Sequence, residues 1–208
     1  MNTRKLWYIV VIAVLVVAAS AVPVKADTLV YDNGPINGTI NAWTINFGFS
    51  VSDSFTVGAG ITNLTTATIG LWAFPGDIPS TVDWQIGTAF FGSDIASGTS
   101  SFTNTDLGPN SFGFELWSST FSIATPIAPG TYFLTLDNAT VPNGDPLYWD
   151  ENDGPSSAME NSVGPIGSET FLINGTGGVT QTPEPASLLL LGSGLLGLAS
   201  GIRRRMKA

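Results

Sequence analysis

Between residues 27 and 174 the chain consists of short runs in which apolar and polar side chains alternate. In residues 131–136, Tyr132, Leu134 and Leu136 fall on one face of an extended chain. Because side chains of a strand point to opposite faces with a period of two, this pattern predicts half-buried strands. Similar runs, rich in β-branched and aromatic residues, occupy residues 28–31, 50–57, 67–74, 82–86, 88–91, 112–121 and 169–173.

Glycine, proline, asparagine and aspartate separate these runs, as in residues 32–35 (Asp-Asn-Gly-Pro) and 75–77 (Pro-Gly-Asp). Such residues favour turns, and strong helix formers are scarce in the same region. Within one run, Phe112, Phe114 and Leu116 are in phase, which predicts that they share a face of a strand. About eight short strands joined by turns predict an all-β fold, an antiparallel β-sandwich or jelly-roll-like domain.

The first residues of the chain have the three parts of a secretory signal peptide. Arg4 and Lys5 provide a basic start, and residues 6–19 are apolar. Residues 24–26 (Val-Lys-Ala) then offer small or modest side chains at the cleavage-site positions, with residues 19–21 (Ala-Ser-Ala) as the alternative. This organisation predicts a cleaved signal peptide over residues 1–26. The alternative is an uncleaved membrane anchor, but the apolar run is shorter than a typical membrane span.

A second apolar run, residues 186–202, lies near the C-terminus. As a helix it would be about 25 Å long, at the short end of what crosses a bilayer. Arg203, Arg204 and Arg205 follow it and would remain in the cytoplasm, so the β domain would face outward. The chain thus divides into a signal peptide (1–26), a β-sandwich domain (27–174), a flexible linker (175–182) and a C-terminal segment with a transmembrane helix (183–208).

Charge is distributed very unevenly along the chain. Residues 27–182 contain no Lys, Arg or His but hold 15 of the 16 acidic residues. With its carboxylates ionised, this region carries a charge of about −15. Such a surface repels nucleic acid and attracts cations, so no nucleic-acid partner is expected. The chain also has no cysteine, so no disulfide holds the domain together.

The same composition removes the side chains of most catalytic mechanisms. Without His and Cys there is no imidazole base, thiol nucleophile or ordinary zinc site, and the domain has no Lys for a Schiff base. We therefore predict no catalytic residues and no enzyme. Two chemistries remain open, a pair of carboxylates as in glycosidases and the binding of a hard cation.

The densest group of acidic and amide side chains lies in residues 145–155. Asp150, Asn152 and Asp153, together with backbone carbonyls, could bind calcium, which prefers oxygen ligands. The alternative is an acidic, turn-rich loop without a metal, because these residues are common in loops. We favour the loop without a metal and expect no cofactor, with calcium as the one that remains open.

The C-terminal segment resembles a known sorting signal. Pro183, Glu184 and Pro185 precede the apolar run, and the three arginines of residues 203–205 end it. This arrangement resembles the PEP-CTERM sorting signal of Gram-negative bacteria, a tail that is also labelled the C-terminal domain of ice-binding proteins. The resemblance implies export by the general secretion machinery, a membrane-inserted intermediate held by the C-terminal helix, and processing by an exosortase, a membrane cysteine protease. The cargo would then reach the cell surface or the medium.

The middle region resembles a recurrent cargo domain of PEP-CTERM proteins, for instance in residues 31–34 (Tyr-Asp-Asn-Gly) and 148–152 (Tyr-Trp-Asp-Glu-Asn). The resemblance carries no assigned activity. We expect a structural or adhesive protein of the cell surface or extracellular matrix that is associated with exopolysaccharide. The alternative is a carbohydrate-binding module or a carboxylate-dependent glycosidase. A row of exposed aromatic side chains would favour carbohydrate binding, and a purely buried aromatic core would favour the structural role.

Overall fold

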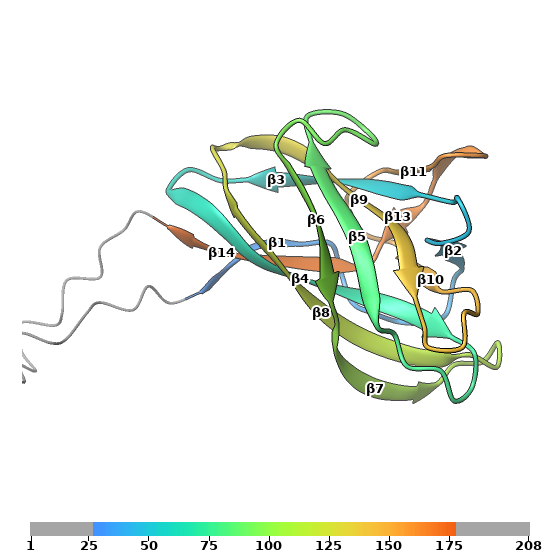
Figure 1. The fold of residues 1–208 in the computed structure, drawn as a ribbon. Coiled ribbons are helices and arrows are strands. Elements are labelled where there is room, and N and C mark those ends of the chain that lie inside the picture. Colours follow the sequence, from blue (N-terminus) through green and yellow to red (C-terminus); the bar gives the residue numbers. More distant parts are fainter. Residues whose placement is uncertain (1–26, 178–208) are drawn as a thin grey trace, which may run out of the picture. The chain divides into compact units, whose positions relative to one another are not determined.

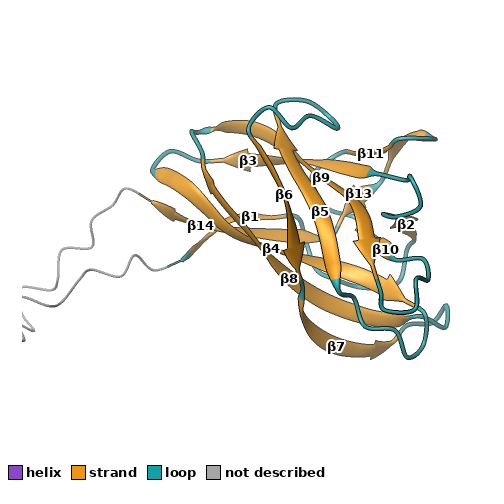
Figure 2. Ribbon diagram, viewed as in Figure 1, coloured by secondary structure: helices purple, strands orange, loops and turns teal. Residues whose placement is uncertain are grey.

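The structure is a computed structural model that describes residues 27–177 (Figure 1). The predicted signal peptide and the predicted C-terminal transmembrane helix lie outside these residues. Within the described range the chain contains strands and loops but no helix (Figure 2). It follows that no helix of this part of the chain is long and apolar enough to cross a membrane.

The described residues form fourteen strands: β1 (Thr28–Asp32), β2 (Ala42–Thr44), β3 (Val51–Val57), β4 (Ile61–Ala73), β5 (Thr81–Gly87), β6 (Ala96–Ser101), β7 (Thr103–Pro109), β8 (Glu115–Pro126), β9 (Gly130–Thr140), β10 (Tyr148–Asn152), β11 (Ala158–Glu160), β12 (Gly164–Ile166), β13 (Ser168–Glu169) and β14 (Phe171–Gly177). β14 continues to Gly177, three residues into the segment that was predicted as linker.

The strands form two antiparallel sheets, which confirms the predicted all-β, antiparallel fold. The larger sheet has eight strands; it follows the order β1-β14-β4-β10-β13, with β8 also on β4, β7 on β8, and β2 on β10. The smaller sheet has six strands in the order β12-β11-β3-β9-β5-β6. In Figure 1 they lie as two layers, the arrangement of a β-sandwich.

One hydrophobic core lies between the two sheets, and both contribute side chains to it. Leu134 and Leu136 of β9 face Leu71 and Trp149 of the larger sheet, and all four are fully buried. Burial of a large apolar side chain contributes about 1.5–3 kcal/mol. Because this core lies within one compact unit of the chain, we expect the domain to fold without its terminal segments.

One predicted strand does not form. Residues 88–91 were predicted as a strand, but β5 ends at Gly87 and the chain turns back. A Cβ on Gly87 would lie 2.4 Å from the carbonyl carbon of Gly92, so this close approach of the backbone requires glycine. The aromatic residues that suggested a strand pack on the surface instead, with the rings of Phe90 and Phe133 4.4 Å apart.

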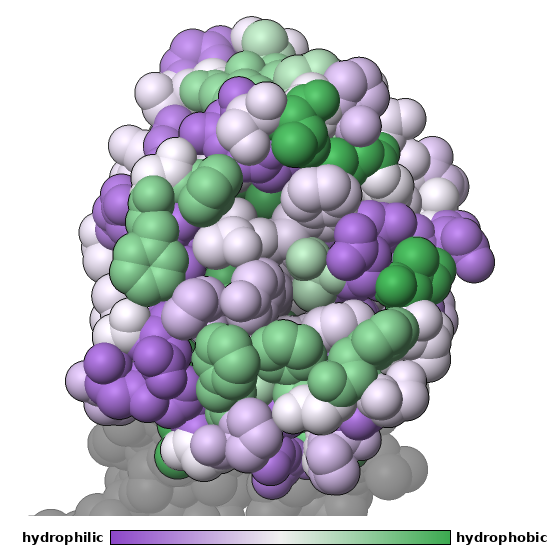
Figure 3. Space-filling model, turned by 90° about the vertical axis from the view of Figure 1, so that its right-hand side faces the viewer, coloured by the Kyte–Doolittle hydropathy of each residue, from purple (hydrophilic) through white to green (hydrophobic). Residues whose placement is uncertain are grey.

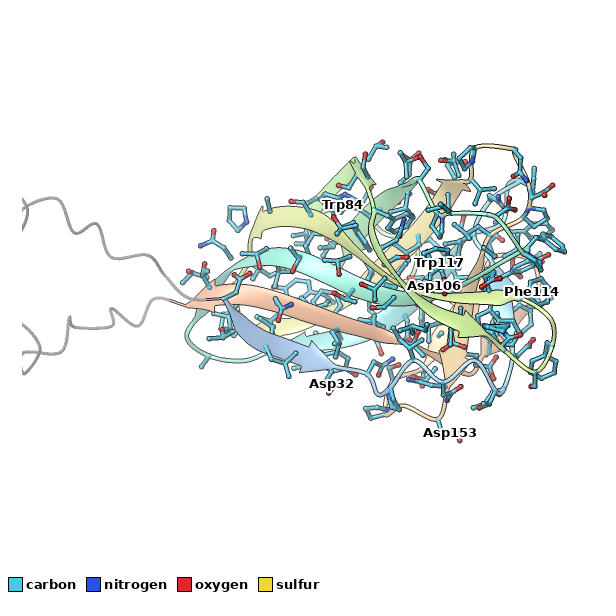
Figure 4. All side chains as sticks on the ribbon, turned by 90° about the horizontal axis from the view of Figure 1, so that it is seen from below. Asp32, Trp84, Asp106, Phe114, Trp117 and Asp153 are labelled. Carbon is cyan, nitrogen blue, oxygen red and sulfur yellow. The ribbon has the colours of Figure 1, made fainter. Side chains whose placement is uncertain are left out.

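The two ends of the domain have different contents. Thr28 lies opposite Gly175 in the β1–β14 pair, so the chain enters and leaves the domain at the same end. Phe114 lies at the other end (Figure 4). We call this the distal end of the domain; it carries exposed aromatic side chains.

Candidate functional site

Two strands of the larger sheet place aromatic side chains on the face that points away from the core. Trp72 of β4 lies directly opposite Tyr148 of β10. The neighbouring pair, Leu71 and Trp149, points into the core instead, because side chains alternate along each strand. The alternation predicted for residues 67–74 therefore determines which aromatic rings of β4 point away from the core.

The loop between β7 and β8 adds two phenylalanines. Phe112 stacks on Trp72 with ring centroids 5.2 Å apart and an interplanar angle of 22°. Phe114 lies 5.2 Å from Phe74 and 5.5 Å from Tyr148. We call these five residues, Trp72, Phe74, Phe112, Phe114 and Tyr148, the aromatic surface cluster. The prediction that Phe112 and Phe114 belong to a strand is wrong, because β8 begins at Glu115 and both rings stand on the preceding loop.

A single asparagine holds this loop in shape. Asn110 Oδ1 accepts hydrogen bonds from the backbone N–H groups of Phe112 and Phe114, both at 3.0 Å. The Asn110 N–H donates to the Phe114 carbonyl at 2.8 Å, and Gly113 supplies the left-handed backbone conformation of the turn, with φ at 87°. The two rings are therefore positioned by the backbone before any ligand arrives.

Several of the rings are open to solvent. Phe112 is 55 % exposed and Phe74 is 38 % exposed, whereas Trp72 is buried beneath them. Figure 3 views this end of the molecule and shows apolar side chains gathered between polar ones. Exposed aromatic rings in contact with each other offer apolar faces on which the apolar face of a sugar ring can stack.

Polar groups border the cluster on the side of the loop before β10. The Asn143 side chain donates to Asp77 Oδ1 at 2.6 Å and to Asp145 Oδ2 at 3.0 Å. Burial and the Asp145 carboxylate both raise the pKa of Tyr148, so its hydroxyl stays a proton donor. An aromatic surface bordered by hydrogen-bonding groups matches a sugar, which has an apolar face and polar hydroxyl groups.

The residues predicted to bind calcium lie further along β10 and in the loop that follows it. Asp150 is buried, and its carboxylate accepts hydrogen bonds from Trp72 Nε1 at 2.7 Å and from the backbone N–H groups of Asn37 and Gly38 at 3.1 Å. Burial raises the pKa of Asp150 although these donors act in the opposite direction. Asp150 thus connects the aromatic surface cluster to the loop before β2.

The other two predicted ligands are not equivalent to Asp150. Asn152 is buried; its Oδ1 accepts from the Gly154 N–H and its Nδ2 donates to the Asn33 carbonyl. Asp153 is exposed and points outward, as Asp32 does (Figure 4). Within residues 27–177, no three acidic side chains are already arranged as a set of metal ligands. Calcium binding by Asp150, Asn152 and Asp153 stays a prediction.

The fold and the cluster define an all-β domain with two antiparallel sheets and an aromatic surface at one end. The comparison with protein families adds the destination of the chain, because residues 181–205 match the PEP-CTERM protein-sorting motif. This match confirms the predicted PEP-CTERM sorting signal, which lies outside the described residues. The parts assigned to residues 183–185 and 203–205 within it stay a prediction. A search of curated proteins gave no match. The motif implies processing by an exosortase, export and targeting to the cell surface.

Proposed function

We propose that the domain is a non-catalytic adhesive module of the cell surface or matrix and that it binds exopolysaccharide through the aromatic surface cluster. The observation that carries this proposal is the stack of Phe112 on Trp72, with Phe74 and Phe114 beside it, at an exposed end of the sandwich. An exposed ring contributes little to the stability of a domain, so exposed and preorganised rings favour a binding role.

The position of the cluster also supports this role. The chain enters and leaves the domain at one end, and Phe114 lies at the opposite end. A domain attached through its C-terminal segment would therefore present the cluster away from the point of attachment. Because the rings are held by Asn110 and by the sheet, binding would order few side chains, which favours affinity.

The test is affinity electrophoresis and calorimetry of the isolated domain with exopolysaccharide from the producing bacterium and with a panel of neutral polysaccharides. We expect Phe112→Ala to weaken binding about tenfold, because one aromatic stack contributes about 0.5–1.5 kcal/mol beyond its buried area. Phe47→Ala is the matched control, since Phe47 is 63 % exposed and forms no aromatic pair within the described residues.

Equal binding by Phe112→Ala, Phe74→Ala and wild type would refute the aromatic surface cluster as the binding site. An equal loss of polysaccharide binding in the Phe47→Ala control would instead indicate nonspecific binding by exposed aromatic rings. The unfolding midpoint of each variant shows whether the fold is retained.

A carboxylate-dependent glycosidase is the second candidate, because two carboxylates face each other on the smaller sheet. Asp83 of β5 lies opposite Asp137 of β9 in an open depression of about 390 Å³, and burial together with Asp83 raises the pKa of Asp137. The Asn138 side chain donates to Asp83 at 3.0 Å. Release of reducing sugar by wild type, and its loss in Asp137→Asn, would establish this activity and displace the adhesive role.

A further inference from the structure

A carboxylate lies inside the sandwich on strand β3. Val51, Asp53, Phe55 and Val57 share the face that points into the core, so Asp53 occupies a position where the other three side chains are apolar. Asp53 is fully buried, and its Oδ2 accepts hydrogen bonds from the Glu169 N–H at 2.8 Å and from the Ser156 hydroxyl at 2.8 Å. The buried group is therefore bound to the strand that carries Glu169.

Glu169, whose backbone N–H contacts Asp53, has a second buried carboxylate. Its residue is 0 % exposed, and neither of its carboxylate oxygens has a hydrogen-bond partner in the described part of the chain. Asp53 is the charged group with the largest effect on Glu169, followed by Glu151, its cross-strand neighbour in β10, and by Asp150. A buried polar atom without a partner costs about 1–3 kcal/mol, and more when it is charged, so this arrangement needs an explanation.

Asn33, the residue after β1, lies in a cluster of oxygen atoms around Asp53. Its side-chain nitrogen lies 2.6–3.1 Å from four oxygens: Asp53 Oδ2, Ser156 Oγ, Ser168 Oγ and the Glu169 carbonyl. An amide NH₂ group has two hydrogens and can satisfy two of these acceptors. The Ser156 and Ser168 hydroxyls are 2.8 Å apart and supply one donor each. With the Glu169 N–H, these donors suffice for the four oxygens, so the two Glu169 carboxylate oxygens are the acceptors left without a donor.

No positive side chain can compensate the buried carboxylates, because residues 27–182 contain no Lys, Arg or His. Burial raises the pKa of Asp53 to about 6, and burial, with Asp53, Glu151 and Asp150 acting in the same direction, raises the pKa of Glu169 well above its ordinary value. At neutral pH the pair therefore requires either bound protons or a bound cation.

We propose that Asp53 and Glu169 are ligands of a hard divalent cation, and that calcium is the ion that fits. Calcium takes six to eight oxygen ligands in flexible geometry and accepts carboxylates, carbonyls and neutral oxygens together. No three acidic side chains of residues 27–177 form a ready ligand set, so the remaining ligands are the neutral oxygens around Asn33. Rotation of the Asn33 amide by 180° would add its own oxygen, since its two ends are assigned from contacts.

The site lies beneath a surface loop, and the export of the chain would bring it into contact with the ion. Ser156 is half-buried and lies between the exposed residues Pro155 and Ser157, so the loop between β10 and β11 forms a thin cover. The sorting motif implies export, and extracellular modules bind calcium with dissociation constants of about 10⁻⁴–10⁻³ M. Magnesium fits less well, because it demands near-octahedral geometry and keeps several waters.

The test compares the melting temperature of the isolated domain in millimolar calcium with that in sodium chloride of matched ionic strength, both at neutral pH after removal of metal by a chelator. We expect calcium to raise the melting temperature by about 5–10 °C when its concentration is a hundred times the dissociation constant. Glu169→Gln and Asp53→Asn should abolish this rise. The control Asp106→Asn changes an exposed acid on β7 and should keep it.

Glu169→Gln should also melt higher than wild type in chelator at neutral pH, because the amide has no charge to bury. If a variant does not fold, terbium luminescence of the wild-type domain gives an independent result. Trp149 is buried, and Trp43 donates a hydrogen bond to Glu151 at 2.6 Å. Both indole rings can therefore sensitise the luminescence of a bound terbium ion. One terbium per domain, displaced by calcium, is expected.

Two outcomes would overturn the proposal. Equal melting temperatures in the two salts, with no terbium signal, would show that the pair is compensated by protons alone. A calcium response that persists in Glu169→Gln but disappears in Asp153→Asn would place the ion at the loop of Asp150, Asn152 and Asp153.

Discussion

The aromatic surface cluster exposes apolar side chains to solvent, whereas the Asp53–Glu169 pair buries acidic side chains inside the domain. Phe112 is 55 % exposed at the distal end of the domain, whereas Glu169 is 0 % exposed within it. Removing an exposed ring costs the fold little, while an uncompensated buried carboxylate lowers the stability of the folded state. The first region can therefore be altered to change binding alone, whereas the second links the fold to pH and to cations.

The largest predicted effect comes from the core residue that lies between these regions. Trp149 is 0 % exposed, its Nε1 donates to the Thr170 carbonyl at 2.8 Å, and its ring lies 5.8 Å from that of Phe171. Trp149→Ala should lower the free energy of unfolding by about 3–5 kcal/mol. Phe112→Ala should change it by about 0.5 kcal/mol or less. Urea unfolding checks both, and a large destabilisation by Phe112→Ala would contradict the assignment of its ring to a binding surface.

The second prediction concerns pH in the presence of a chelator. The folded pKa of Asp53, about 6, lies above its ordinary value of 3.8, so the folded state binds a proton more tightly than the unfolded state. This contribution is fully present below pH 3.8 and is lost as pH rises through about 6. A shift of this size corresponds to about 3 kcal/mol. The raised pKa of Glu169 acts in the same direction.

The measurement is the difference in unfolding free energy between wild type and Asp53→Asn across this pH range, which removes the titration of the other acids. Wild type should lose stability relative to Asp53→Asn as pH rises. Calcium should restore it at neutral pH if the pair binds the ion. A pH-independent difference would show that Asp53 titrates alike in the folded and unfolded states.

The third prediction concerns Asn110, where a smaller effect is expected than at Trp149 or Asp53. Asn110→Ala removes the acceptor of two backbone N–H groups on an exposed loop, at a cost of about 1 kcal/mol. The fold should remain, but polysaccharide binding should weaken because Phe112 and Phe114 lose their fixed positions. Asn110→Asp keeps the acceptor and should bind nearly as wild type, so equal weakening in both variants would argue against preorganisation.

Sequence patterns predicted the strands whose side chains alternate most regularly. Residues 82–86 and 131–136 lie in β5 and β9, with Val82, Trp84 and Leu134 buried as their phase requires. β6 and β7 were not predicted, because their residues are mainly polar and each is a strand through pairing with β5 or β8. The local pattern of apolar and polar residues reflects which side chains are buried. Strand pairing depends instead on partner strands far along the chain.

The aromatic surface cluster and the Asp53–Glu169 pair could be predicted from the sequence to different degrees. Phe112 and Phe114 had the spacing of a strand, but Asn110 and Gly113 turn the backbone there and lift the rings onto the surface. Glu169 offered no signal, and Asp53 offered one weak signal, an acid in phase with apolar residues. The proximity of these two acids could not be predicted, since 116 positions separate them and only the packing of the sheets joins them.

The sequence alone determined the all-β class, the acidic domain without basic side chains and the sorting signal of residues 181–205. These properties depend on composition, on the period of the side chains and on a contiguous motif, all of which are local. The tertiary structure alone decided that rings from β4, β10 and a loop form one surface, and that Asn33, Asp53 and Glu169 converge between the sheets. The physical reason is that both clusters are assembled by long-range strand pairing, which brings distant side chains within a few ångströms of each other.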